Sequence, residues 1–169
     1  MKAPMSWEQR GTAAQNGLIP LRFLLGEWTG HGESDGVVIR GTCLVRAILN
    51  DTFVQVDEKL FDASGTIIHE DHCFYRFEPT DGRIHLTHMM AHAWLTERSV
   101  EVLPDGSGIR WFDGPFSPIV KLTKSPSGFR SEVWLPSDNA QPPALSSHMD
   151  YFPANEQENQ HSETDGAPQ

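Results

Sequence analysis

A chain of 169 residues, 38% of them hydrophobic, is long enough for one domain with a buried core. Thirteen basic residues against 23 acidic ones give a formal net charge of −10, and without a Lys/Arg cluster this argues against nucleic acid or an anionic membrane surface as a partner. The first residues lack the apolar core of a signal peptide, and no stretch approaches the roughly 18 apolar residues of a membrane span, so we expect a cytoplasmic protein.

The composition divides the chain into three regions. Residues 1–18 are polar, and we expect a flexible N-terminal segment there. Residues 19–153 carry the apolar patterning of a folded domain. Residues 154–169 contain no large apolar side chain, so this tail cannot bury enough surface to offset its ordering entropy, and we expect it to be disordered.

The folded region begins with a short helical turn and then a strand. Pro20 suits the first position of a helical turn, where its missing N–H needs no partner, and Gly26 can adopt the left-handed conformation that ends such a turn. From Trp28 the period changes to two, which puts Trp28, Gly30 and Gly32 on one side of a strand. A bulky side chain beside two bare positions suits a strand that bends while its neighbours close around an interior.

The rest of this region alternates between apolar segments and tight turns. Turn sequences such as Ser34-Asp35-Gly36 and Thr80-Asp81-Gly82 recur at hairpin spacing. Apolar residues alternate along the segments 37–49 and 52–60, and no helical stripe follows Leu25. About ten short strands predict an all-β fold, a single antiparallel meander barrel wide enough to enclose a ligand. A sandwich of two open sheets is the alternative.

One predicted strand, over residues 83–94, carries candidate ligand-binding residues. Alternation puts the following side chains on one face: Ile84, Leu86, His88, Met90, His92 and Trp94. That face is apolar enough to point into the barrel, where imidazoles can fix the orientation of a ligand. Alternatively, His88 and His92 bond to neighbouring strands or reach solvent at the barrel mouth.

In an earlier segment of the chain, His69 and Glu70 are expected to form a surface pair.

His148 is the candidate metal ligand. It follows the proline-rich loop 141–143 and opens a short apolar strand. A neutral imidazole in an apolar site can act as a metal ligand. An exposed histidine at a strand edge is the alternative interpretation.

Three segments carry a likeness to a known family. They are Phe23–Gly32 with its Gly-x-Trp-x-Gly-x-Gly pattern, Ile68-His69-Glu70 followed by Tyr75-Arg76, and Gln141–Met149. In these segments the chain resembles the nitrobindins, haem-binding barrels of the calycin group, which also holds lipocalins and fatty-acid-binding proteins. The resemblance implies haem b as the cofactor and His148 as the ligand of its iron. The residues expected around the cofactor are Trp28, Thr29, Gly30, Gly32, His88, Met90 and His92.

The resemblance also implies an activity. Ferric haem in such a barrel could isomerise peroxynitrite to nitrate, with the iron supplying the chemistry, so enzymatic activity is left open. The alternatives are a haem-free calycin that carries a fatty acid or another lipophile, and a barrel with a filled interior and a structural role. The expected partner is an apolar small molecule, and a homodimer is one option for the oligomeric state.

Overall fold

The computed structural model describes residues 5–91, 93–112, 114, 117–136 and 142–156. The predictions for residues 1–4 and for the tail beyond residue 156 lie outside these ranges. The beginning of the tail, Ala154–Glu156, forms the short 3-10 helix η2. Within the described ranges, no helix is long and apolar enough to cross a membrane.

Two helical elements precede the barrel. The helix α1 (Trp7–Gly17) begins at a capping box, in which Ser6 and Gln9 satisfy each other's backbone N–H groups. The sequence pattern does not predict this helix, because α1 buries none of its side chains and therefore shows no apolar stripe. The predicted helical turn is the 3-10 helix η1 (Ile19–Leu24), which has Pro20 in its first turn and buries Leu21 and Leu24 completely.

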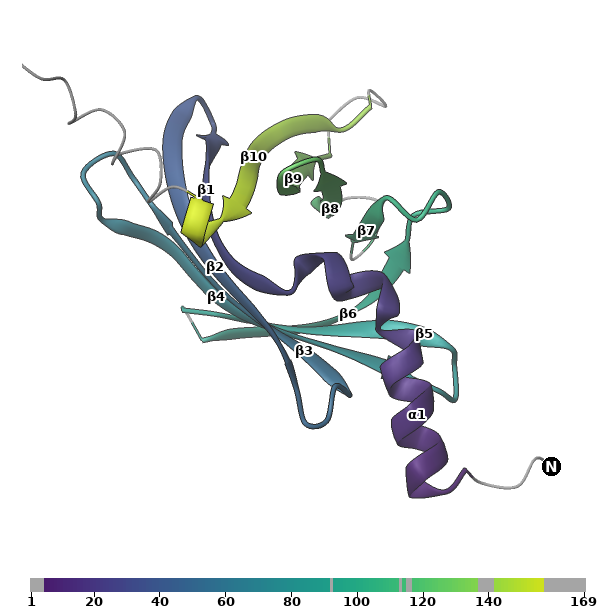
Figure 1. Ribbon diagram of the computed structural model, residues 1–169. Coiled ribbons are helices and arrows are strands. Elements are labelled where there is room, and N and C mark those ends of the chain that lie inside the picture. Colours follow the sequence, from purple (N-terminus) through teal and green to yellow (C-terminus); the bar gives the residue numbers. More distant parts are fainter. Residues whose placement is uncertain (1–4, 92, 113, 115–116, 137–141, 157–169) are drawn as a thin grey trace, which may run out of the picture.

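The described residues form ten strands, which close into one antiparallel barrel (Figure 1). Each strand pairs with the next along the chain, and the first strand closes the barrel against the last. The strands are β1 (Gly26–Ser34), β2 (Val37–Ile48), β3 (Phe53–Phe61), β4 (Ile67–Glu78), β5 (Arg83–Met90), β6 (Trp94–Val102), β7 (Gly108–Trp111), β8 (Ile119–Ser125), β9 (Gly128–Leu135) and β10 (Ala144–Pro153). This order confirms the predicted meander barrel and excludes the sandwich.

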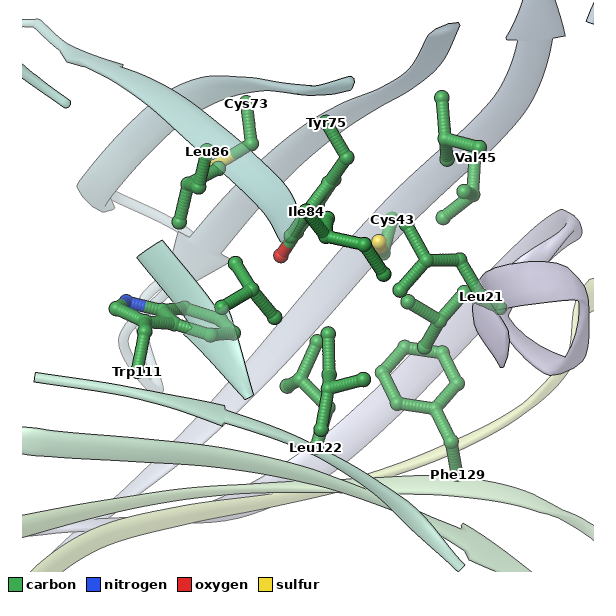
Figure 2. Close-up of a cluster of buried hydrophobic side chains, with 14 of the residues drawn as sticks. Leu21, Cys43, Val45, Cys73, Tyr75, Ile84, Leu86, Trp111, Leu122 and Phe129 are labelled. Atoms are coloured by element: carbon green, nitrogen blue, oxygen red, sulfur yellow. The ribbon is translucent and has the colours of Figure 1, made fainter. Parts of the chain in front are cut away.

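Apolar side chains from all around the barrel meet in its interior. Figure 2 shows strands on both sides contributing to this core, with Leu21 entering from η1. Tyr75 and Trp111 meet edge to face, with ring centroids 6.1 Å apart. Because η1 packs on β7 and β9, it closes the end of the barrel at which β1 begins.

The glycines of β1 allow β10 to approach closely. A Cβ atom on Gly30 would lie 2.7 Å from the ring of Tyr151, and one on Gly32 would lie 1.8 Å from the backbone oxygen of His148. The space expected beside Trp28 is therefore real, but β10 occupies it. Gly26, at the start of the strand, has the positive φ of 142° that glycine tolerates best.

Candidate functional site inside the barrel

Four ionisable side chains point into the barrel from three neighbouring strands. Glu58 of β3 shares its face with buried Val54, while His69 and Asp71 of β4 share theirs with buried Tyr75. His88 of β5 lies on the face of buried Leu86. The start of β4 and the end of β5 meet at the end of the barrel opposite η1, so these side chains gather at that end. We call Glu58, His69, Asp71 and His88 the interior polar cluster.

Asp71 lies between two imidazoles. Its Oδ2 is 2.7 Å from Nε2 of His88 and 3.4 Å from Nε2 of His69. The Asp71 side chain is 8% exposed, that of His88 is 13% and that of His69 is 37%. Burial by itself would raise the pKa of Asp71, but the hydrogen bonds from His69 and His88 outweigh burial and hold this pKa below its ordinary value. The hydrogen bond between His69 and Asp71 in turn raises the pKa of His69.

Glu58 is the second carboxyl group of the cluster. Its Oε1 accepts a hydrogen bond from the hydroxyl of Tyr151, which reaches across from β10. Burial, followed by the charge of Asp71, raises the pKa of Glu58 to about 7. Burial also raises the pKa of the Tyr151 hydroxyl, which therefore stays protonated and can donate.

The cluster continues onto β6 and is surrounded by apolar groups. Nη1 of Arg98 lies 3.5 Å from Nδ1 of His88. Cys43, paired in register with Glu58, and Cys73, paired with His88, are free and buried, and burial raises the pKa of both thiols. The site thus combines a buried carboxylate, two imidazoles and a carboxyl group that titrates near neutral pH. Such a set can bind a polar group, exchange a proton or ligate a metal ion.

The residues of the Gly-x-Trp-x-Gly-x-Gly pattern make packing contacts in the structure. Trp28 meets Phe129 edge to face at 5.2 Å, and its Nε1 donates a hydrogen bond of 2.7 Å to the backbone oxygen of Leu24. Thr29 alternates with Trp28, and its buried Oγ1 has no hydrogen-bond partner in the described part of the chain. The role of Trp28, Thr29, Gly30 and Gly32 in binding a cofactor stays a prediction.

The predicted strand over residues 83–94 is present only in part, because β5 ends at Met90 and Trp94, expected on the inner face, begins β6 and is exposed. His88 and Met90 lie on the same face as buried Leu86, while His92 lies outside the described residues. His88 bonds to Asp71 on a neighbouring strand, as the alternative interpretation proposed.

The expected surface pair of His69 and Glu70 is wrong. His69 turns inward to Asp71, whereas Glu70 points outward and pairs with Lys59 at 2.9 Å. Neighbouring residues of a strand face opposite sides, so His69 and Glu70 cannot share one surface.

His148 lies on the other face of β10. It alternates with Met149 and Tyr151, which are buried in the barrel, and its register neighbours are Glu33 on β1 and Glu132 on β9. A haem iron needs an imidazole surrounded by apolar groups that contact the porphyrin. The two flanking carboxyl side chains and the outward register do not fit a haem held by His148 inside the barrel. Ligation of iron by His148 therefore stays a prediction of the resemblance alone.

Sequence reasoning missed Glu58, Asp71 and Tyr151 as site residues. The alternation along β3 indicates Glu58, because this residue alternates in step with Val54, Val56 and Leu60 and therefore shares their strand face. A charged residue within an otherwise apolar strand face marks a buried polar site. The contact of Glu58 with Tyr151 joins residues that are far apart in sequence, so only the closed barrel reveals it.

An open groove of about 680 Å³ lies outside the barrel. Lys121 and Trp134, which line it, alternate with the inward-facing Leu122 and Val133. Pro104 and Pro143 form part of its rim. The groove is therefore separate from the interior polar cluster.

No protein-family model and no curated protein matches this chain.

Proposed function

We propose that the protein binds a small, largely apolar molecule inside the barrel and holds the polar group of that molecule with the interior polar cluster. The observation that carries this proposal is the inward placement of Asp71, with a side chain only 8% exposed, together with Glu58 and two imidazoles. A closed meander barrel is also compatible with the calycin group, whose members bind small ligands.

The free energy that it costs to bury the interior polar cluster supports this proposal. Removing a carboxylate from water costs several kcal/mol unless hydrogen bonds replace its hydration, and apolar residues of similar size often stabilise a core better. Glu58 shows the cost directly, because its pKa is raised to about 7. The rest of the core closes the barrel with apolar side chains and does not need these groups. A role in recognition explains why they are there.

The surroundings define the class of ligand. Cys43, Cys73 and Met149 are buried apolar neighbours on the inner face, while the cluster offers both hydrogen-bond donors and acceptors. Ligand sites combine these two features, an apolar lining and a few placed polar groups. A lipophile with one hydrogen-bonding head matches the pattern.

Haem b and peroxynitrite isomerisation remain a separate prediction from the resemblance. Because the neighbours of His148 do not fit an iron ligand inside the barrel, we derive no chemical step from haem.

The proposal can be tested with 8-anilinonaphthalene-1-sulfonate, a fluorescent apolar anion. Native mass spectrometry first identifies any small molecule that copurifies, and delipidated protein is then titrated with the dye in the presence of EDTA. His88→Gln alters the cluster, whereas His85→Gln alters the same strand on its outer face, where His85 bonds to Asp81 at 2.8 Å.

We expect one dye molecule to bind per chain in the wild type and in H85Q, and binding about tenfold weaker in H88Q, a loss of about 1.4 kcal/mol. Circular dichroism checks that both variants are folded. Absence of any copurified molecule and of saturable dye binding would favour the filled barrel. Equal affinities of H88Q and H85Q would contradict a role for the cluster.

A further inference from the structure

Three potential metal-binding atoms converge within the interior polar cluster. They are Nε2 of His69, Oδ2 of Asp71 and Nε2 of His88, and all lie within 4.8 Å of one another. His69 and Asp71 are two residues apart on β4 and therefore share a face, and His88 reaches the same place from the adjacent strand β5. Two imidazoles and one carboxylate are a ligand set that Zn²⁺ and other divalent first-row metals use, with further positions left open.

The spacing of the three atoms is close to that of a coordination sphere. Metal–nitrogen and metal–oxygen bonds of about 2.0–2.2 Å put tetrahedral ligand atoms roughly 3.3 Å apart. The 3.4 Å between His69 and Asp71 already matches this spacing. The 2.7 Å between His88 and Asp71 has to lengthen by roughly 0.6 Å. Side-chain rotation can supply such a change without movement of the strands.

The second oxygen of Asp71 provides an independent observation. Oδ1 is buried and has no hydrogen-bond partner among the residues that the structure describes, although the side chain is only 8% exposed. A buried carboxylate oxygen without a partner is costly and calls for an explanation. A metal ion coordinated by Asp71 would neutralise the carboxylate and interact with both of its oxygens.

The protons of the cluster are compatible with a metal ion. A metal ion bound at Nε2 of His88 would replace any proton that this nitrogen shares with Asp71, and the ring would then carry its proton on Nδ1. Nη1 of Arg98, at 3.5 Å from Nδ1, is at the long limit of a hydrogen bond, so this contact is weak and can yield. The 37% exposure of the His69 side chain leaves a route for the ion from solvent.

We propose that His69, Asp71 and His88 bind one divalent transition-metal ion inside the barrel, with at least one coordination position left open. This inference goes beyond the proposed ligand binding and does not depend on it, because three side chains suffice to hold the ion.

Zn²⁺ and Co²⁺ are suitable probes, added to the full-length, tag-free protein after removal of metals with EDTA and of bound lipids. Isothermal titration calorimetry gives the stoichiometry and affinity for Zn²⁺, and the visible d–d spectrum of Co²⁺ reports its coordination. X-ray absorption fine structure of the Zn²⁺ form counts the imidazole ligands.

The variants are Asp71→Asn, His88→Gln and His69→Gln. The matched control is His72→Gln, since His72 follows Asp71 on β4 but faces outward and pairs with Asp57 at 2.6 Å.

We expect one Zn²⁺ per chain with two imidazole ligands in the wild type and in H72Q. Each of the other variants should bind at least about 100-fold more weakly, beyond the 10–100-fold that loss of a hydrogen-bonding partner outside the coordination sphere costs. H69Q changes the most exposed of the three ligands and so keeps the test valid if D71N does not fold. Absence of stoichiometric binding, wild-type affinity in H69Q and H88Q, or an equal loss in H72Q would overturn the proposal. Dye binding in EDTA is measured separately, so failure here leaves the ligand proposal standing.

Discussion

Glu58 shows most clearly how one residue links sequence to site. The alternation of β3 forces its side chain inward, where burial and the charge of Asp71 oppose its ionisation. Tyr151 donates a hydrogen bond to it and offsets part of this cost. The result is a carboxyl group that can hold or release a proton near neutral pH, next to two imidazoles.

Glu58→Gln should stabilise the metal-free protein at alkaline pH. Because the folded carboxyl group keeps its proton up to a pH of about 7, against an ordinary pKa of 4.5, its ionisation costs stability as the pH rises through this window. Gln retains an oxygen that accepts from Tyr151 but cannot ionise. In urea unfolding with EDTA, we expect E58Q to exceed the wild type by up to about 3 kcal/mol at about pH 8, and by little at about pH 5. A difference that is independent of pH would show that Glu58 is not destabilised by ionisation.

His148→Ala tests the haem prediction at the level of one side chain. Since His148 faces away from the core and lies between Glu33 and Glu132 in register, any Soret band that hemin produces with the wild type should persist in H148A. Absorbance titration with hemin measures this, with His85→Ala as the control on another outward-facing histidine. A band that disappears in H148A and survives in H85A would establish His148 as the iron ligand.

At the scale of the elements, close approach of backbones shapes the barrel. β1 can lie against β10 because Gly30 and Gly32 present no side chain to it, and α1 can end against β4 because Gly17 has none. At these positions the methyl group of an alanine would overlap with neighbouring atoms.

Gly32→Ala should weaken the closure between β1 and β10. The new Cβ would lie 1.8 Å from the backbone oxygen of His148, so one strand must move. We expect a loss of about 3 kcal/mol or more in the free energy of unfolding, measured with urea. A loss below about 1 kcal/mol would mean that the two strands are not packed so closely.

The two glycines of α1 should respond in opposite directions to alanine. A Cβ on Gly17 would lie 2.0 Å from the ring of Phe77, whereas one on Gly11 would meet nothing within 4 Å. We expect Gly17→Ala to cost about 1–3 kcal/mol and Gly11→Ala to add up to about 1 kcal/mol, both measured by urea unfolding. Equal effects of the two substitutions would show that α1 is not docked on β4 as described.

At the scale of the whole molecule, the meander and the closure were predictable from the sequence, but the content of the interior was only partly so. Turn sequences and period-two alternation determine the strands, and the bare positions beside Trp28 point to closure. The helix α1 escaped prediction because its stability comes from its cap rather than from an apolar face. The contact of Glu58 with Tyr151 joins β3 to β10 and depends on how the whole barrel closes. The contact of Asp71 with His88 depends on the exact register of the β4–β5 hairpin, in which a slip of one residue would turn these side chains to the other face.

The most direct test of the account is to ask which histidines sense a ligand. Nitrogen-detected NMR of the imidazole groups, recorded in EDTA while 8-anilinonaphthalene-1-sulfonate is added, reports this residue by residue. We expect the signals of His69 and His88 to shift until the protein is saturated, while those of the outward-facing His72, His85 and His148 stay in place. Shifts confined to His148 or to the other outward-facing histidines, with His69 and His88 unmoved, would contradict a binding site inside the barrel.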